Sequence, residues 1–78
     1  MKKLYFYTTT CCHLCEQAEN LLRSLAGVVS FECEMIDIAE SDQLVAQYGT
    51  KIPVLKNSKT GSEKCWPFTA EQLVQWIR

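Results

Sequence analysis

An apolar, aromatic run followed almost at once by a helical pattern constrains the fold of this chain more than any other feature. The run Leu4-Tyr5-Phe6-Tyr7 predicts a central strand over residues 3–8, buried on both faces. From Leu14 to Leu25, apolar residues recur at the spacing of one helical face, and Gly27 is placed to end the helix in a left-handed cap. The sequence therefore predicts a strand that feeds directly into a helix.

The next apolar pattern alternates residue by residue. Phe31, Cys33 and Met35 alternate with glutamates, which is typical of a half-exposed or edge strand, and the segment continues to residue 38. Because Cys33 lies on the apolar phase, we expect it to be a buried, inert thiol. A strand, helix, strand unit of this kind is normally right-handed and makes its two strands parallel.

The second half of the chain predicts a short helix, a hairpin and a closing helix. Ser41 can cap a helix that ends near Gly49, and residues 52–55 form a strand with Pro53 at its entrance. The polar residues 56–62 predict a turn into a strand at 63–66. Thr69 begins a capping-box pattern, so we expect a last helix that reaches residue 77. Three aromatic side chains are expected to fill the core beneath it: Trp66, Phe68 and Trp76.

Size and charge restrict the class of protein. The 78 residues allow one domain, residues 1–78. The formal net charge is -1 and the basic residues are scattered, so we expect neither nucleic acid nor a membrane surface as a partner. The lysines and short apolar run at the start do not match an export signal, which favours a cytoplasmic protein, and we expect a monomer.

The 5 cysteines are an odd number, and a reducing compartment favours redox, metal-binding or buried thiols over structural cross-links. Cys12 and Cys15 stand three apart at the predicted start of the first helix. The unpaired N–H groups and dipole of a helix start stabilise a thiolate. Cys12 could then attack a disulfide, and Cys15 could resolve the mixed disulfide that forms. The sequence therefore predicts a redox-active dithiol.

These motifs resemble the glutaredoxin and thioredoxin superfamily, and within it the short glutaredoxin-like proteins. The matching residues are Leu4-Tyr5-Phe6-Tyr7-Thr8, Cys12-His13-Leu14-Cys15 and Ile52-Pro53-Val54-Leu55. The resemblance implies an α/β, thioredoxin-like three-layer fold, with a four-stranded mixed sheet of order 2-1-3-4 flanked by three helices. It also implies a cis peptide before Pro53, which would turn the N–H and C=O of Ile52 toward the sulfurs to pair with an extended substrate. The implied activity is thiol–disulfide oxidoreduction on a thiol or disulfide protein substrate.

Glutathione-binding members of the superfamily carry a Gly-Gly pair and an acidic residue after the hairpin, where this chain has Glu63-Lys64-Cys65-Trp66 instead. We therefore expect no cofactor, and glutathione is a candidate reductant whose usual binding motif is incomplete. Lys51, beside the proline, could still attract a carboxylate. His13, when protonated, could favour a neighbouring thiolate.

Two other functions stay open at this point. Cys11, Cys12 and Cys15, with His13, are soft ligands for a metal ion or iron–sulfur cluster, although a fourth ligand such as Cys65 or a partner chain would be needed. The leading interpretation includes no metal site and treats Cys11 as a spare thiol. The other alternative is a thioredoxin-fold binding module that does not catalyse any reaction.

Overall fold

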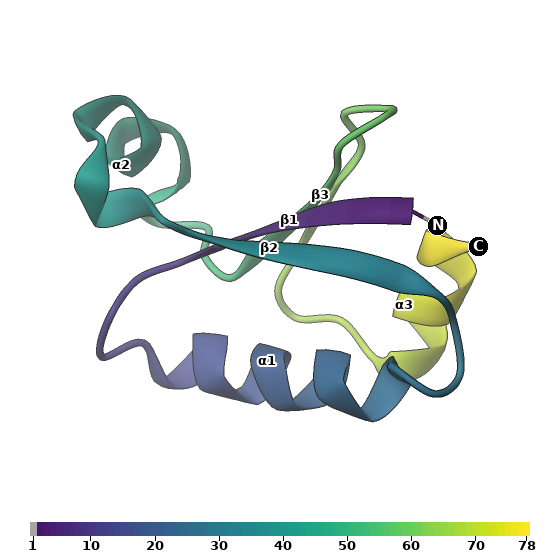
Figure 1. The fold of residues 1–78 in the computed structure, drawn as a ribbon. Helices are drawn as coiled ribbons and strands as arrows, with labels where there is room; N and C mark the ends of the chain where they lie inside the picture. The colour runs from purple at the N-terminus through teal and green to yellow at the C-terminus, as the bar shows by residue number, and fades with distance from the viewer. Residues whose placement is uncertain (1) are drawn as a thin grey trace.

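The computed structural model describes residues 2–78, and its strands form one mixed sheet (Figure 1). The spatial order of the strands is β2-β1-β3-β4. β1 is parallel to β2 and antiparallel to β3, and β3 is antiparallel to β4. The bounds are β1 Lys2–Thr8, β2 Phe31–Asp37, β3 Val54–Asn57 and β4 Glu63–Cys65. The expected order 2-1-3-4, with the first strand inside the sheet, is confirmed.

Helices on both faces of the sheet make three layers. α1 and α3 lie on one face, whereas α2 lies on the other face at one end of the sheet (Figure 1). The bounds are α1 His13–Leu25, a 3-10 turn at Ile38–Glu40, α2 Asp42–Tyr48 and α3 Ala70–Ile77. This is the thioredoxin-like arrangement that the sequence resemblance implies.

Two hydrophobic clusters hold the layers together, and they differ in size. The larger cluster lies between the sheet and α1 and α3, and its buried members are Leu4, Phe6, Cys15, Ala18, Leu22, Leu25, Leu55, Phe68, Leu73 and Ile77. The smaller cluster lies under α2, and its buried members are Tyr7, Ile38, Tyr48 and Val54. Phe68 is buried as expected, but Trp66 and Trp76 only cover the edge of the larger cluster and stay half-buried.

The parallel pairing of β1 and β2 fixes where the cysteine motif lies. Thr8, the last residue of β1, is paired with Asp37, the last residue of β2. The loop that follows β1 therefore lies beside the carboxyl end of β2. Since this loop carries the first cysteines, the dithiol is placed at that edge of the sheet.

Local capping signals set the start of α2 and α3. Thr69 Oγ1 accepts a hydrogen bond from the N–H of Gln72 at 3.2 Å, and Gln72 Oε1 accepts one from the N–H of Thr69 at 3.0 Å. This reciprocal pair is the predicted capping box. Ser41 caps α2 in the same way, because its Oγ accepts from the N–H of Leu44 at 3.3 Å. Both predicted helix starts are confirmed.

The prediction of a left-handed cap at Gly27 is wrong. α1 closes instead at Ala26, which has right-handed helical angles (φ -59°, ψ -27°). The N–H groups of Val28 and Val29 both donate to the carbonyl of Leu25, at 2.9 and 3.1 Å. Because these bonds satisfy the end of the helix, no residue with positive φ is required there.

The turn between β3 and β4 follows its sequence pattern. Asn57 Oδ1 accepts hydrogen bonds from the N–H groups of Lys59 and Thr60, at 2.9 and 3.2 Å. Gly61 supplies the positive φ of 77° that lets the chain turn back. The predicted hairpin is confirmed. The peptide before Pro53 is cis, as the resemblance implies, and the peptide before Pro67 is also cis, which the sequence did not indicate.

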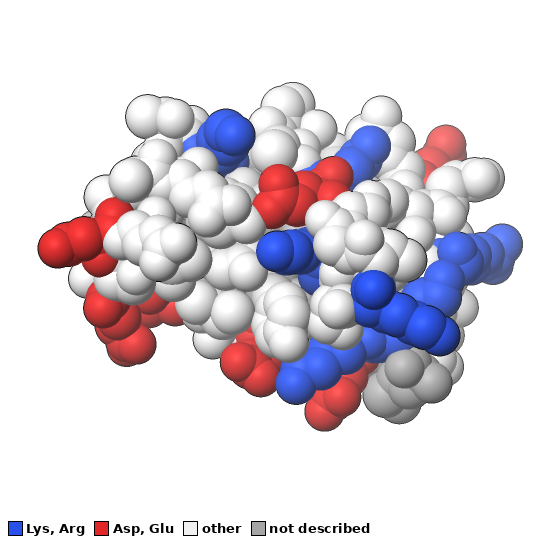
Figure 2. Space-filling view, turned by 90° about the horizontal axis from the view of Figure 1, so that it is seen from above, with Lys and Arg blue, Asp and Glu red and all other residues white. Residues whose placement is uncertain are grey.

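Figure 2 shows the face of the sheet opposite α1, where basic and acidic side chains are interspersed. Several Lys and Arg side chains gather toward the end that carries the termini, and acidic side chains are prominent near α2. Within residues 2–78, none of the helices has the length and apolar character needed to cross a bilayer.

Candidate functional site

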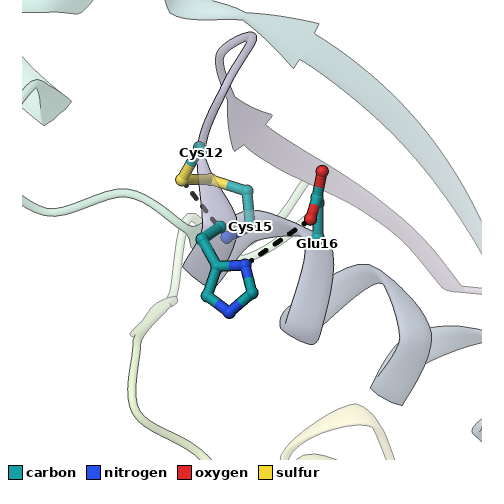
Figure 3. Close-up of polar contacts among 4 residues, drawn as sticks. Cys12, Cys15 and Glu16 are labelled. Carbon is teal, nitrogen blue, oxygen red and sulfur yellow. Dashed lines mark hydrogen bonds and ion pairs between the residues drawn. A yellow bond between two sulfur atoms is a disulfide. The ribbon is translucent and has the colours of Figure 1, made fainter.

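Cys12 occupies the N-cap position of α1. Its backbone is extended (φ -101°, ψ 103°), and its carbonyl already accepts the N–H of Glu16 at 3.1 Å. The N–H of Cys15 points to Cys12 Sγ at 3.2 Å, in the position that a capping oxygen normally takes (Figure 3). Cys12 Sγ therefore lies at the positive end of the α1 dipole, where a thiolate is stabilised.

Cys12 and Cys15 are joined as a disulfide, with their Cα atoms 5.2 Å apart (Figure 3). The two sulfurs differ in their surroundings. Cys15 is only 4% exposed and belongs to the larger hydrophobic cluster, whereas Cys12 is half-buried and lies at the cluster's edge. An incoming molecule therefore meets Cys12 first.

A cavity of about 290 Å³ opens beside the dithiol. Its walls come from the loop after β1, the first turns of α1 and the end of β2: Thr8, Thr9, Thr10, Cys11, Cys12, Cys15, Glu16, Glu19, Met35 and Asp37. We call this space the dithiol cavity. Its walls contain carboxylates and hydroxyls but no Lys or Arg. Cys11, which is exposed, reaches the cavity wall through a left-handed backbone (φ 59°) that only a few per cent of residues other than glycine adopt.

His13 has an exposed side chain that lies beside a carboxylate. Its side chain is 81% exposed, and its Nδ1 lies 3.7 Å from Glu16 Oε2. A protonated His13 would pair with this carboxylate, so part of its charge would be compensated before it could act on Cys12. The tuning role of His13 stays a prediction.

The proline loop, residues 49–53, connects α2 to β3. Ile52 is half-buried and, like Cys12, packs against the larger cluster, while Pro53 is buried. The expectation that both the N–H and the C=O of Ile52 are free for a substrate is wrong for the N–H, which donates to the carbonyl of Tyr48 at 3.1 Å. Lys51 also donates its N–H to that carbonyl, at 2.8 Å, and Lys51 itself is exposed.

The comparisons with known proteins agree with this geometry. A family model described as "Glutaredoxin-like domain (DUF836)" matches residues 3–78. The chain belongs to this family. The family match covers the dithiol, the proline loop and both hydrophobic clusters of the glutaredoxin-like domain.

Solved structures share this fold. The X-ray structure of the structural genomics target protein XcR50 from X. campestris has a TM-score of 0.79 and 35% identity, and the match covers 95% of this chain and 93% of that chain. Protein Ne2328 from Nitrosomonas europaea has a TM-score of 0.84 and 29% identity, over 99% of this chain and 92% of that chain. A mutant thioredoxin from Halobacterium salinarum NRC-1 has a TM-score of 0.76 and 22% identity, over 97% of this chain and 71% of that chain, and shows the fold alone. A comparison with curated protein sequences gave no match.

Tyr48 supports the proline loop of this glutaredoxin-like domain, and sequence reasoning missed this role. Its ring, 2% exposed, stacks on Tyr7 with centroids 4.3 Å apart. Its hydroxyl donates a short hydrogen bond to the carboxylate of Glu63 on β4, and its carbonyl accepts the two loop N–H groups described above. Burial, together with the Glu63 carboxylate, raises the pKa of Tyr48. The sequence predicted a short helix here, but nothing in its pattern pointed to Glu63 as a partner of Tyr48.

The remaining thiols lie outside the Cys12 and Cys15 pair. Cys33 and Cys65 are exposed, so the expectation that Cys33 is buried is wrong. The reason is that β2 is an edge strand and Cys33 lines an open cavity between β2 and α1. Partial desolvation still raises the pKa of the Cys33 thiol, and the Glu19 carboxylate raises it further, which disfavours the reactive thiolate.

Side chains that could bind a metal ion do not cluster among the described residues. Among residues 2–78, no three His, Cys, Asp or Glu side chains are arranged so that they could hold a metal ion. Cys12 and Cys15 are bonded to each other in the disulfide, which leaves Cys11 as the one free thiol in the wall of the dithiol cavity. The arrangement of thiols therefore matches dithiol chemistry better than a ligand set.

Proposed function

We propose that this protein is a thiol–disulfide oxidoreductase that uses Cys12 and Cys15. One observation carries the proposal: a half-buried sulfur at a helix N-cap is paired with a buried sulfur one turn later, with a Cα–Cα distance of 5.2 Å. The first sulfur can be reached and is stabilised as a thiolate. The second is held close enough to displace whatever the first has bound.

The reaction begins with the reduced dithiol. The Cys12 thiolate attacks one sulfur of a substrate disulfide, a Cys12–substrate bond forms, and the other substrate sulfur leaves as a thiolate. The Cys15 thiolate then attacks Cys12 Sγ, so that the Cys12–Cys15 bond forms and the second substrate sulfur leaves. Two electrons pass to the substrate, and the two protons lost by the protein thiols go to the two substrate thiolates. The reverse sequence oxidises a substrate dithiol.

The burial of Cys15 supports this order of events. A substrate bonded to Cys12 can keep its place at the surface while Cys15 attacks from within the cluster. In the proline loop, the carbonyl of Ile52 can accept a hydrogen bond from the substrate, whereas its N–H already donates to the carbonyl of Tyr48. Lys51 offers a positive charge next to that carbonyl.

Regeneration of the reduced form needs two thiol equivalents, which glutathione or a protein dithiol could supply. We propose that the protein acts as a monomer in the cytoplasm and that its substrate is a thiol or disulfide protein. In this proposal it holds no cofactor and binds neither nucleic acid nor a membrane. Glutathione would serve as a reductant rather than as a tightly held ligand, because the residues after the hairpin lack the family's usual glutathione motif.

A redox titration tests the proposal. Wild type and Cys12→Ser are equilibrated with dithiol buffers of defined potential, and mass spectrometry maps which cysteines are paired. We expect a reversible Cys12–Cys15 disulfide in the wild type and loss of exchange with a small disulfide in Cys12→Ser. Cys65→Ser is the matched control, since it removes an exposed thiol elsewhere, and it should titrate like the wild type. Unchanged exchange in Cys12→Ser would refute the assignment.

A further inference from the structure

A second cavity lies between α1 and the edge strand β2. Its volume is about 290 Å³, and its walls are mostly apolar: Phe6, Glu19, Leu22, Arg23, Ala26, Phe31, Cys33 and Met35. The side chains of Phe31, Cys33 and Met35 share this face because they alternate along β2. Met35 is 53% exposed and gives the cavity an open apolar rim.

The dithiol cavity lies next to this one. Glu19 and Met35 line both of them, so the two spaces share a wall on α1 and a wall on β2. We call the combined space the α1–β2 groove. It runs along β2 from the apolar end near Phe31 to the cysteine pair. A chain lying in it would be delivered to Cys12.

The backbone of β2 can also contribute to binding. β2 is the terminal strand of the sheet order β2-β1-β3-β4 and pairs only with β1 (Figure 1). Its outer edge is therefore open over Phe31–Asp37, and an open edge can accept an extended chain through main-chain hydrogen bonds. The proline loop offers fewer main-chain partners to a substrate, since the N–H of Ile52 already donates to the carbonyl of Tyr48.

The charge of the groove selects among occupants. Arg23 lies 2.7 Å from Glu19 and compensates its charge. At the dithiol end Glu16 and Asp37 remain, and no Lys or Arg lines that end. Asp37 Oδ1 also accepts the N–H of Ala39 at 2.9 Å, which keeps its carboxylate in place. This end of the groove is complementary to a positive charge and unfavourable for the two carboxylates of glutathione.

We propose that the α1–β2 groove binds an extended segment of the substrate protein. The segment places an apolar side chain against Phe31 and Met35, and a Lys or Arg next to its reactive cysteine faces Glu16 and Asp37. This proposal rests on the proposed thiol–disulfide exchange and names the class of substrate for the same dithiol.

A trapped complex tests where the segment lies. Cys15→Ser keeps Cys12 but cannot resolve a mixed disulfide, so a short peptide with one cysteine, an adjacent lysine and leucines on both sides can be held on Cys12. Mass spectrometry confirms the site of attachment, and NMR chemical shifts are compared with those of the same variant carrying a small neutral thiol. We expect added shifts at Leu22, Phe31 and Met35. Shifts confined to residues 49–53 would overturn the proposal.

Kinetics provide a second, independent test. The substrate here is the disulfide form of the same peptide, which carries a lysine and leucines beside its cysteine. Met35→Ser should lower kcat/KM for its reduction about fivefold, the effect of losing part of one apolar contact. Val45→Ser is the matched control, because Val45 is also an exposed apolar residue (44%) but lies on α2 on the other face. Replacing the lysine of the peptide with glutamate should lower the rate about fivefold at low salt and less at high salt.

A small neutral disulfide, hydroxyethyl disulfide, separates this proposal from the proposed function. The selectivity measured is the ratio of kcat/KM for the peptide disulfide to kcat/KM for hydroxyethyl disulfide. A ratio that falls in Met35→Ser but not in Val45→Ser supports the groove. Turnover of every disulfide without any effect of Met35 or of peptide charge overturns the groove and leaves the oxidoreductase intact. No turnover of either probe by wild type overturns both. A concentration-dependent dimer that loses its contact in Met35→Ser would assign the groove to a second copy and overturn the substrate role.

Discussion

The two parts of the candidate site, the dithiol and the proline loop, are supported on opposite faces of the sheet and by different interactions. The dithiol begins α1, which packs with α3 over ten buried residues that include Cys15. The proline loop follows α2, which rests on only four buried residues and on the hydrogen bonds of Tyr48. The position of the dithiol therefore depends on hydrophobic burial, whereas the position of the loop depends on one aromatic side chain and its partners. Substitutions on the two faces should have different consequences.

The largest effect should come from the larger cluster. Leu73 on α3 is 0% exposed, and Leu73→Ala should lower the free energy of unfolding by about 3 kcal/mol, because it removes a buried side chain and leaves a cavity. Denaturant unfolding of the oxidised protein measures the loss. Leu14→Ala is the matched control, since Leu14 is 44% exposed on α1 and should change the unfolding free energy little. Equal losses in the two variants would show that α3 does not hold the dithiol helix as described.

Removal of the Tyr48 hydroxyl should have a smaller and more local effect. Tyr48→Phe keeps the stack on Tyr7 but removes the donor to the Glu63 carboxylate, which is exposed and can turn to water, so the loss should be about 1 kcal/mol. Glu63→Gln retains an acceptor and should cost less. Hydrogen exchange gives the sharper measurement. In Tyr48→Phe, the amides of Lys51 and Ile52 should exchange faster through local opening, while the amides in α1 should still exchange only through global unfolding. A uniform change across both faces would contradict the separation.

The pH dependence of stability should report on the proline-loop side of the sheet through Tyr48. Burial and the Glu63 carboxylate raise the pKa of Tyr48 above its ordinary value of about 10, so the folded state holds the phenolic proton more tightly than the unfolded state does. The stability from this group is therefore complete below pH ~10 and is lost as the pH rises above it, by at most about 1.4 kcal/mol per pH unit.

The measurement is the difference in unfolding free energy between wild type and Tyr48→Phe across this pH range. Other groups titrate in both proteins and cancel in the difference. The difference should shrink above pH ~10. A constant difference would mean that the folded environment leaves the proton affinity of Tyr48 unchanged.

The elements that sequence reasoning placed correctly are those whose signals are local. The aromatic run of β1, the spacing in α1, the capping residues Ser41 and Thr69, and the turn at Asn57 and Gly61 each act within a few residues. The N-cap position of Cys12 is local in the same sense, which is why the dithiol could be located before its surroundings were known.

Apart from the cap expected at Gly27, which local bonds from Val28 and Val29 replace, the features that sequence reasoning missed depend on neighbours far along the chain. Cys33 lies on an apolar phase, yet its burial depended on whether another element would cover the edge of β2, and none of the described elements does. The bond from Tyr48 to Glu63 spans 15 residues and requires the last residue of α2 to come within reach of β4. The groove beside the dithiol likewise needs the spacing between α1 and β2, which periodicity along one segment does not contain.

The smallest predicted difference concerns the two helix caps. Thr69→Ala removes the capping box of α3 and should lower the global unfolding free energy by about 1 kcal/mol, because α3 closes the larger cluster. Ser41→Ala removes the cap of α2 and should cost less globally, since α2 can fray while the larger cluster stays folded. Thr69→Ser and Ser41→Thr keep a hydroxyl and serve as controls. In Ser41→Ala, the loop amides of Lys51 and Ile52 should lose protection that they keep in Thr69→Ala, and the opposite pattern would mean that the loop is held by α3 rather than by α2.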